Sequence, residues 1–364
     1  MKSILLIGKL PPPYYGPAIA TQIILNSTIK NNFKLSFFDT KLNKSVEGLG
    51  KFGWKKIFTT LNKYILYSNT VKSEKPEVIL IPISQSTIGF IKDAGYIWIG
   101  VLKGSKVVIH LRGSQFLNWY NAAFGITKYF IRKTLRSTSG VIVLGNSLRY
   151  LFDSFYNPEE IFVVPNGGNF KIPVIEKNKI IITYIANYKA SKGFGVFLEA
   201  IALLPAEIKN SVEIHALGQW SDLNFKDTCE ASIKSNGLNI IFHDPKIADD
   251  KFQLLAKTSV FVFTPIAPEG HPWVIVEAMA AGLPVIATDQ GAIKESVIDN
   301  YNGFIIPAGN SKVLCEKLIL LINDAALRKS MGENSKLRYL ENFTEDKMVE
   351  NLSGVINTVL NNHK

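Results

Sequence analysis

The chain has 364 residues, of which 47% are hydrophobic and 20% are charged. This length suits two domains better than one, and the composition is ordinary for a soluble α/β protein with two sizeable cores. It excludes a membrane-spanning protein, because no run approaches the ~20 apolar residues that a spanning helix needs. A disulfide scaffold is also excluded, since Cys229 and Cys315 show no paired or metal-binding spacing. The chain enters a strand-like run at MKSILLIG without a secretion signal, so we expect a cytoplasmic protein.

The net charge of +11 is unevenly distributed along the chain. Residues 1–170 contain 21 Lys and Arg against 8 Asp and Glu (21 − 8 = +13), whereas residues 171–364 contain 20 against 22 (20 − 22 = −2). The basic first half is either a solvated face or a surface that meets an anionic partner, such as phospholipid head groups or a lipid diphosphate. No nucleic-acid-binding motif accompanies the charge, so nucleic acid is not expected as a partner.

Apolar runs of strand length recur along the whole chain. They are continuous and rich in Val and Ile, which is typical of parallel strands covered on both faces. Segments with helical spacing separate many of them, for example 191–204, 223–236 and 310–322, so the pattern predicts two doubly wound α/β domains. The nine predicted strands are 3–8, 78–84, 107–113, 140–145, 161–167, 180–187, 212–218, 261–265 and 284–289.

The most marked break in this alternation is the segment NGGNFKIPVIEKNK, in which glycines, a proline and charges precede a fresh strand. We therefore expect a first domain over 1–169 and a second over 170–344. A final amphipathic helix is predicted over about 345–361, and the C-terminal segment 345–364 is expected to pack back on the first domain.

Two positions of the first half lie where a ligand is expected. The loop GKLPPPYYGPAIATQ lacks the GxGxxG fingerprint, which argues against an NAD-dependent oxidoreductase. Gly16, just before a predicted helix, is either a plain loop glycine or a place where a phosphate or sugar approaches the backbone. His110 lies near the carboxyl end of a predicted strand, the edge at which such sheets bind ligands, so it is either a core residue or a ligand contact.

Two segments of the first half combine basic and aromatic residues. A basic amphipathic helix can lie in a membrane interface, although such stripes also pack on protein cores. Both interpretations stay open here. The segment 51–67 places Trp54, Ile57, Phe58, Leu61 and Ile65 on one helical face, and 115–136 places Phe116, Trp119, Tyr120, Phe124, Tyr129, Phe130 and Ile131 among Lys128, Arg132, Lys133 and Arg136.

The second half contains the most informative stretch, PEGHPWVIVEAMAAGLPVIATD over 268–289. Pro272 suits the first turn of a helix, and Gly282 marks its end, so the stretch predicts a loop, a short helix, a tight turn and a strand. Glu269 and Glu277 are separated by seven residues around the helix start, where backbone N–H groups are free. This arrangement predicts a ligand site.

Upstream, NYKASKG over 187–193 joins a predicted strand to a helix. Lys189 or Lys192 could therefore meet phosphate oxygens, or both could be exposed turn lysines. Gly218 lies at the end of another strand.

Together these motifs resemble the retaining glycosyltransferases of family four, which have the GT-B fold and an E-x7-E motif, in particular those of bacterial surface-polysaccharide synthesis. VPNG (164–167), SKG (191–193), LGQW (217–220) and NGFIIP (302–307) occur in the order of that family. The resemblance implies two Rossmann-like, doubly wound parallel-sheet domains that face each other across a cleft. The domain 1–169 would lie on the acceptor side, and the domain 170–344 would bind the nucleotide sugar.

The resemblance also implies roles for individual residues. Glu269 would bind hydroxyls of the transferred sugar, Glu277 the nucleotide ribose, and Lys192 the departing diphosphate. His110 would touch the donor sugar, and Gly16 would line the diphosphate. The other donor-binding positions would be Asn187, Lys189, Gly218, Gly270, His271, Pro272, Trp273 and Val274, with the base near Lys246 and Ile247. Three positions differ from the usual pattern, which has Arg at Asn187, Gly at Pro17 and a second His at Arg112.

The implied activity is transfer of a hexose (EC 2.4.1 type) from a UDP- or GDP-linked sugar to a saccharide or lipid-linked saccharide, with no cofactor and no metal. It would take place in the cytoplasm or at the inner face of the cytoplasmic membrane, with peripheral contact to anionic lipid, during surface polysaccharide (for example lipopolysaccharide) biosynthesis. Two alternatives remain open: a nucleotide-sugar epimerase of similar build and a non-catalytic protein that binds sugar nucleotides.

Overall fold

The protein is described by a computed structural model that covers residues 1–12, 14–41, 54–244 and 248–362, with the side chains of 54–57 and 248–249 left undescribed. The chain forms two compact units. The first comprises residues 1–168 together with 345–364, and the second comprises residues 169–344. Each unit is described by itself below.

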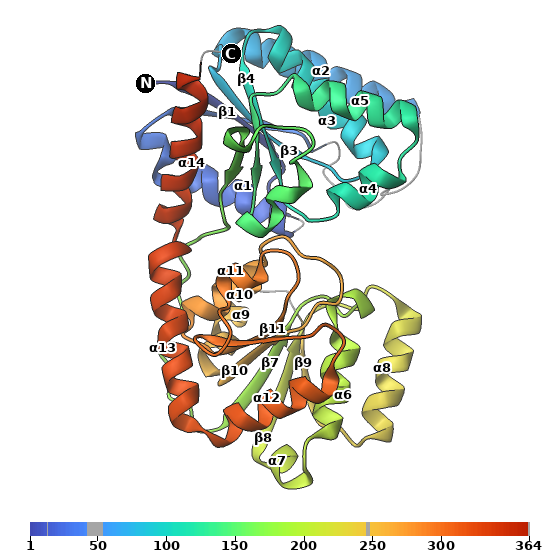
Figure 1. The fold of residues 1–364 in the computed structure, drawn as a ribbon, viewed down its shortest axis with the longest axis vertical. Helices are drawn as coiled ribbons and strands as arrows, with labels where there is room; N and C mark the ends of the chain where they lie inside the picture. The colour runs from blue at the N-terminus through green and yellow to red at the C-terminus, as the bar shows by residue number, and fades with distance from the viewer. Residues whose placement is uncertain (13, 42–53, 245–247, 363–364) are drawn as a thin grey trace. The chain divides into compact units, whose positions relative to one another are not determined.

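The first unit is built on a parallel sheet of six described strands with the order β2-β1-β3-β4-β5-β6, of which β1, β3 and β4 are labelled in Figure 1. The chain places β2 on one side of β1 and then crosses to β3 on the other side. The carboxyl ends of β1 and β3 therefore flank a topological switch point, where sheets of this kind bind ligands. The strands are β1 (Ser3–Gly8), β2 (Lys34–Asp39), β3 (Val78–Ile83), β4 (Lys106–Leu111), β5 (Gly140–Val143) and β6 (Ile161–Val163).

Helices cover both faces of this sheet. One face packs on α1 and on the C-terminal helix α14, whose buried side chains join those of β1, β3 and β4 in one core. On the other side lie α2, α3 and α5, with α3 packed against β3 and β4 (Figure 1). The helices are α1 (Gly16–Asn26), α2 (Trp54–Glu74), α3 (Thr87–Leu102), α4 (Phe116–Ala122), α5 (Gly125–Arg136) and α14 (Glu345–Asn361).

The second unit contains a second parallel sheet of six described strands, in the order β12-β11-β10-β7-β8-β9. Its switch point lies between β7 and β10, because β8 and β9 extend the sheet on one side of β7 and the later strands extend it on the other. The strands are β7 (Ile180–Ile185), β8 (Val212–Leu217), β9 (Ile240–His243), β10 (Val260–Phe263), β11 (Val285–Thr288) and β12 (Gly303–Ile306).

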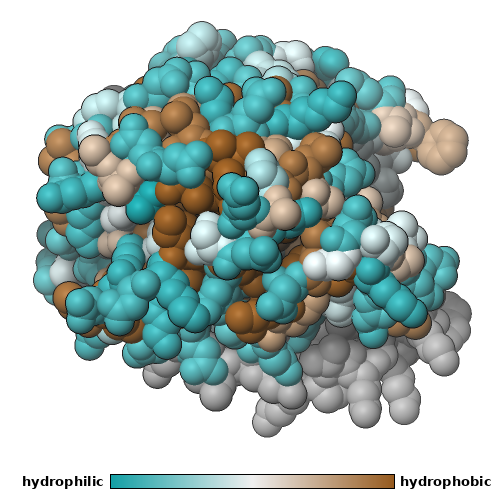
Figure 2. Space-filling view, turned by 90° about the horizontal axis from the view of Figure 1, so that it is seen from below, coloured by the Kyte–Doolittle hydropathy of each residue, from teal (hydrophilic) through white to brown (hydrophobic). Residues whose placement is uncertain are grey.

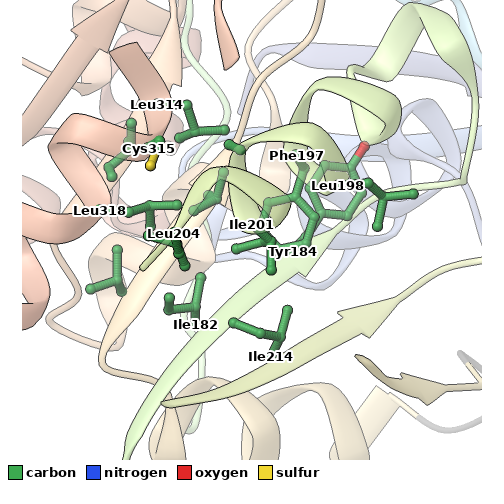
Figure 3. Packing of buried hydrophobic residues seen from close by; sticks show 14 of the residues in the cluster. Ile182, Tyr184, Phe197, Leu198, Ile201, Leu204, Ile214, Leu314, Cys315 and Leu318 are labelled. Atoms are coloured by element: carbon green, nitrogen blue, oxygen red, sulfur yellow. The ribbon is translucent and has the colours of Figure 1, made fainter. Parts of the chain in front are cut away.

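Two cores sandwich this second sheet. On one face, α6, α8 and α12 pack on alternate residues of the strands, and Figure 3 shows Phe197 and Ile201 of α6 lying near Tyr184 of β7. On the other face, α9, α10, α11 and α13 bury the remaining strand side chains. The helices are α6 (Phe194–Leu203), α7 (Ala206–Ser211), α8 (Leu223–Ser235), α9 (Ala248–Lys257), α10 (Trp273–Ala280), α11 (Ile293–Ser296), α12 (Ser311–Asn323) and α13 (Ala325–Asn342).

The nine strands predicted from sequence are confirmed within a few residues, whereas β2, β9 and β12 were not predicted. All three lie at the edge of a sheet. An edge strand has a neighbour on one side only, so β2 and β9 are partly exposed and lack a continuous apolar run. The strand β12 is buried, but its apolar run covers only three residues, 304–306, between Gly303 and Pro307.

Figure 2 views the molecule from below, toward the end of the second unit at which β8 begins, and hydrophilic residues cover most of that face around a smaller hydrophobic area. Among the helices of the described ranges, none is long and apolar enough to cross a bilayer.

Candidate active site

The stretch 268–289 has the predicted order of loop, short helix, tight turn and strand. The loop follows β10, and α10 begins at Trp273 with Pro272 as its N-cap residue in an extended conformation. After the helix, Gly282 adopts a left-handed φ of +67°, and β11 follows at Val285. The segment therefore leaves the carboxyl end of β10, packs on one face of the second sheet as α10, and re-enters the sheet as β11, parallel to β10.

Lys192 and Glu269 meet at this switch point. Lys192 Nζ donates to Glu269 Oε1 over 2.6 Å, although the two residues are 77 positions apart. One follows β7 and the other follows β10, the two central strands between which the switch occurs. Both side chains keep partial exposure, 31% for Lys192 and 16% for Glu269, so the pair is accessible to a ligand.

The turn that carries Lys192 is fixed against the end of β10. The carbonyl of Ser191 accepts from the N–H groups of Ile266 and Ala267. Gly193 caps the turn with φ +78°, and a Cβ there would lie 1.7 Å from the carbonyl oxygen of Thr264. A glycine is needed because any side chain would collide with backbone. The SKG motif thus brings a lysine close to the loop of Glu269.

The loop of Glu269 has a second support that sequence reasoning missed. Gly291 adopts φ +62°, and a Cβ at this position would lie 1.6 Å from the Glu269 carbonyl oxygen. The next residue, Ala292, donates its N–H to the carbonyl of Gly270 over 3.0 Å. The segment after β11 therefore holds the Glu269 backbone in place. The sequence signal is only a glycine after the strand PVIATD, which by itself is weak.

Glu277 is buried in the middle of α10 and has its own lysine. Lys251 of α9 donates to Glu277 Oε1 over 2.5 Å. Burial raises the pKa of Glu277, and the Lys251 charge opposes that rise. Within the described chain, the second oxygen of Glu277, Oε2, is buried and lacks a hydrogen-bond partner. Because a buried acceptor is costly to leave unpaired, this oxygen is suited to a ligand hydroxyl. Nothing in the local sequence pointed to Lys251.

His271 lies inside the second unit, with its side chain only 3% exposed. Its Nε2 and the Ser296 hydroxyl are 2.6 Å apart, and its ring packs 5.1 Å from that of Phe343. Burial lowers the pKa of His271 to about 3. The imidazole therefore ties α11 to the loop before α10, so any contact of His271 with a donor would use its backbone.

The remaining predicted donor-binding residues surround this region of the second unit. Asn187 and Lys189 are exposed in the turn after β7. Gly218 follows β8, and a Cβ there would lie 1.9 Å from the Ala186 carbonyl oxygen, so close packing by itself requires a glycine. Trp273 and Val274 form the first turn of α10. Lys246 and Ile247 lie outside the residues that the structure describes.

The first unit contains the two other predicted residues. Gly16 is the first residue of α1, directly after β1 and its loop. His110 lies near the carboxyl end of β4, where burial and the Arg112 charge hold its pKa well below the usual range. Its Nε2 is buried without a hydrogen-bond partner among the described residues. A neutral imidazole with a free nitrogen is therefore present at this strand end.

A metal-binding cluster of three or more His, Cys, Asp or Glu side chains is absent from the part of the chain that the structure describes. The two carboxylates of the motif instead face two lysines, Lys192 and Lys251.

Comparison with known protein families identifies the family to which part of this chain is similar. Residues 168–338 match the family of glycosyl transferases group 1, and both six-stranded sheets with their helices form the GT-B fold. The segment 168–338 belongs to the group 1 glycosyltransferases, a family that uses nucleotide sugars as donors.

Individual relatives are distant. An uncharacterized glycosyltransferase of Methanocaldococcus jannaschii is 28% identical over 293 residues, covering 79% of this chain and 77% of the relative. A Campylobacter jejuni α-1,4-N-acetyl-D-galactosaminyltransferase, named for a GalNAc-containing diNAcBac-PP-undecaprenol, is 23% identical over 324 residues, covering 86% and 84%. Anabaena HepE, solved with UDP-glucose, superposes with a TM-score of 0.73 at 16% identity, covering 98% of this chain and all of the other.

We predict that Gly291→Ala displaces the Glu269 loop. The added Cβ would overlap the Glu269 carbonyl, so the free energy of unfolding should fall by about 2 kcal/mol more than for Gly309→Ala. Gly309 is the matched control, because it has a similar φ of +77° but no heavy atom within 4 Å of a built Cβ. Glycosyl transfer should also fall, by roughly 100-fold for a shift of about 1 Å. Urea unfolding and activity assays of both variants test this, and equal effects would refute it.

We predict that His271 makes the protein acid-sensitive. The unfolded chain takes up a proton at His271 below about pH 6.5, whereas the folded chain does so only near pH 3, so stability falls as the pH is lowered between these values. Between pH 7 and 4.5 this amounts to roughly 2–3 kcal/mol. His271→Gln removes this component, so its stability should fall less over the same range. The free energy of unfolding of both proteins is measured by urea unfolding across this pH range. An equal fall in both would show that His271 does not cause the acid sensitivity.

Proposed function

We propose that the protein is a retaining, metal-independent hexosyltransferase. It moves a hexose from a UDP- or GDP-linked donor to a saccharide or lipid-linked saccharide acceptor in surface polysaccharide biosynthesis. The observation that carries this proposal is the accessible Lys192–Glu269 pair at the switch point of the second sheet, followed in the chain by α10, in which the buried Glu277 has one unpaired oxygen.

The three charged residues suit three parts of a nucleotide sugar. A carboxylate only accepts hydrogen bonds, so Glu269 suits sugar hydroxyls and the free oxygen of Glu277 suits the ribose hydroxyls. Lys192 would exchange its contact with Glu269 for the donor diphosphate. Its position is kept by the turn through Ser191 and Gly193, so little reorganisation is needed.

In the proposed reaction the bond between the anomeric carbon and the donor phosphate breaks, and the acceptor hydroxyl oxygen bonds to that carbon from the same face. The leaving phosphate oxygen takes the hydroxyl proton. Negative charge grows on the diphosphate as the bond breaks, and Lys192 with the amides at the start of α10 would stabilise it. His110 would contact the sugar as a neutral group, in agreement with its lowered pKa. A glycosyl adduct trapped on a side chain would overturn this front-face mechanism.

The acceptor part of the proposal is supported by exposed apolar side chains on α2. Phe58, Leu61 and Ile65 form one stripe and are 69%, 52% and 60% exposed, whereas Tyr67 and Val71 of the same helix face the core. The segment 115–136 is broken into α4 and α5, and it buries Phe116, Tyr120 and Ile131, whereas Phe124 and Tyr129 are 85% and 64% exposed. An exposed apolar stripe on a basic unit favours peripheral contact with an anionic membrane and hence a lipid-linked acceptor at the inner face. The Campylobacter relative is named for such an acceptor.

We predict that one nucleotide sugar in a panel of UDP- and GDP-linked hexoses raises the melting temperature of the protein. The gain follows mass action, about 2.7 kcal/mol at 100 times Kd. Glu277→Gln should reduce this shift, because the ribose would lose a charged acceptor. If no nucleotide sugar shifts the melting temperature of the wild-type protein, the proposed donor class is wrong.

We predict that Lys192→Met keeps much of this donor-induced melting shift but lowers kcat, measured in a glycosyl-transfer assay, by roughly 100-fold, since the charge acts mainly on the leaving diphosphate. Lys294→Met is the matched control, because it removes a lysine from an exposed ion pair with Asp289. Equal losses in both variants would indicate a general charge effect.

We predict that serine at Phe58, Leu61 and Ile65 together abolishes binding to liposomes containing anionic lipid, measured by flotation. The matched control replaces Leu337 and Leu340, which are similarly exposed on α13 of the second unit. Replacement of Lys128 and Lys133 should weaken liposome binding to a degree that depends on the salt concentration. Replacement of Lys55 and Lys56, whose side chains lie outside the described part, should have the same effect. Absence of wild-type binding would remove the membrane from the proposal.

A further inference from the structure

A cavity of about 260 Å³ lies in the first unit, at the carboxyl ends of β1 and β3. These two strands flank the switch point of the first sheet, and Lys9 and Ser84 directly follow them. The volume corresponds to roughly nine water molecules, which suits one sugar or polyol unit. All of its lining residues belong to the first unit, and the ones relevant here are Lys9, Gln85, Lys92, Asp93, Tyr96 and Arg112.

Positive charge exceeds negative charge in this cavity. Lys9, Lys92 and Arg112 line it with the single carboxylate of Asp93 (3 − 1 = +2). Within the described chain, neither Lys9 nor Lys92 forms an ion pair, and burial lowers the pKa of both Lys9 and Arg112, the latter to about 10. Cations that are partly removed from water without a matching anion favour the binding of one.

Two polar atoms of the cavity residues lack partners. The Tyr96 hydroxyl is buried in a residue that is 1% exposed, and Arg112 Nε is buried as well, yet neither has a hydrogen-bond partner among the described residues. Such groups are costly in a folded protein, and a ligand is one way to satisfy them. The ring of Tyr96 is held edge-on by Tyr64 and Tyr67, with centroids 4.9 and 5.1 Å away, so its hydroxyl is fixed in place.

Asp93 adds an acceptor to this set of donors. One of its oxygens accepts from the Ser84 N–H over 2.7 Å, which orients the carboxylate. Its remaining lone pairs suit the hydroxyl groups of a sugar. The cavity therefore combines donors for an oxyanion with an acceptor for neighbouring hydroxyls.

We propose that this cavity binds the acceptor through an anionic group, a phosphate or carboxylate carried on a sugar or polyol. Arg112 and Lys9 pair with the oxyanion, Tyr96 donates to it, and Asp93 accepts from an adjacent hydroxyl. The identification of the ligand as the acceptor rests on the proposed glycosyltransfer. The binding of an oxyanion does not.

Binding of three probes to the full chain at constant ionic strength tests the proposal: glucose 1-phosphate, glucuronate and glucose, measured by calorimetry and thermal shift. At least one anionic probe should bind at least tenfold more tightly than glucose. Arg112→Gln should weaken that binding by about tenfold or more, as expected for a charged hydrogen bond. Lys30→Gln, which removes an exposed charge elsewhere on the first unit, should not change it.

Tyr96→Phe separates a ligand contact from a structural role. Because the hydroxyl has no partner in the free protein, its removal should not lower the melting temperature, but it should weaken binding of the anionic probe about three- to tenfold. The proposal is overturned if neither anionic probe binds, if glucose binds equally well, or if Arg112→Gln binds the probe as tightly as the wild-type protein does.

A parallel titration with UDP and GDP distinguishes this proposal from the proposed function. If neither nucleotide binds the wild-type protein while the anionic probe does, the donor assignment fails and the anion site stands. If Arg112→Gln and Tyr96→Phe lose nucleotide binding but keep the probe, the cavity belongs to the donor and the proposal is wrong.

Discussion

The candidate site of the second unit is organised around the ion pair between Lys192 and Glu269. It joins the turns after the two strands that border the switch point, and each partner is held by backbone that admits only glycine nearby. An ion pair of this exposure adds little to stability, because water and side-chain entropy offset much of the attraction. Its value lies in position: the two opposite charges are 2.6 Å apart, and the proposed function assigns the carboxylate to sugar hydroxyls and the ammonium group to phosphates.

Some buried polar side chains of the two units have hydrogen-bond partners inside the protein, and others do not. Glu277 has a lysine on one oxygen and an unpaired second oxygen, while Arg112 and Tyr96 in the first unit also keep unpaired polar atoms. Folding alone would not favour such groups, because burial of an unsatisfied donor or acceptor costs free energy. His271 shows the opposite case, with its polar contact to Ser296 made inside the protein. On the proposals above, the unpaired atoms of Glu277, Arg112 and Tyr96 are assigned to ligands, whereas His271 is assigned to the fold.

Much of the fold could be predicted from the sequence, because buried parallel strands leave continuous apolar runs and the E-x7-E segment carries its own start and stop signals. The edge strands β2, β9 and β12 could not, since they are too exposed or too short to give that signal. For the site, the loops of Lys192 and Glu269 could be placed at strand ends, which is where the structure has them. Lys251 and Gly291 could not be found, because their importance comes from tertiary contacts with residues far from them in sequence. The roles of the predicted residues toward a ligand remain predictions.

The C-terminal helix has a consequence for how the chain is made. The first unit is assembled from residues 1–168 and 345–364, and α14 contributes six buried side chains to its core. During synthesis the second unit is therefore complete while the unit that began first still lacks one of its helices. Part of the apolar surface of β1 and β3 stays uncovered until α14 has left the ribosome. A chain that stops short of α14 would then expose its earliest-made sheet, and that end would be the place where chaperones or aggregation act first.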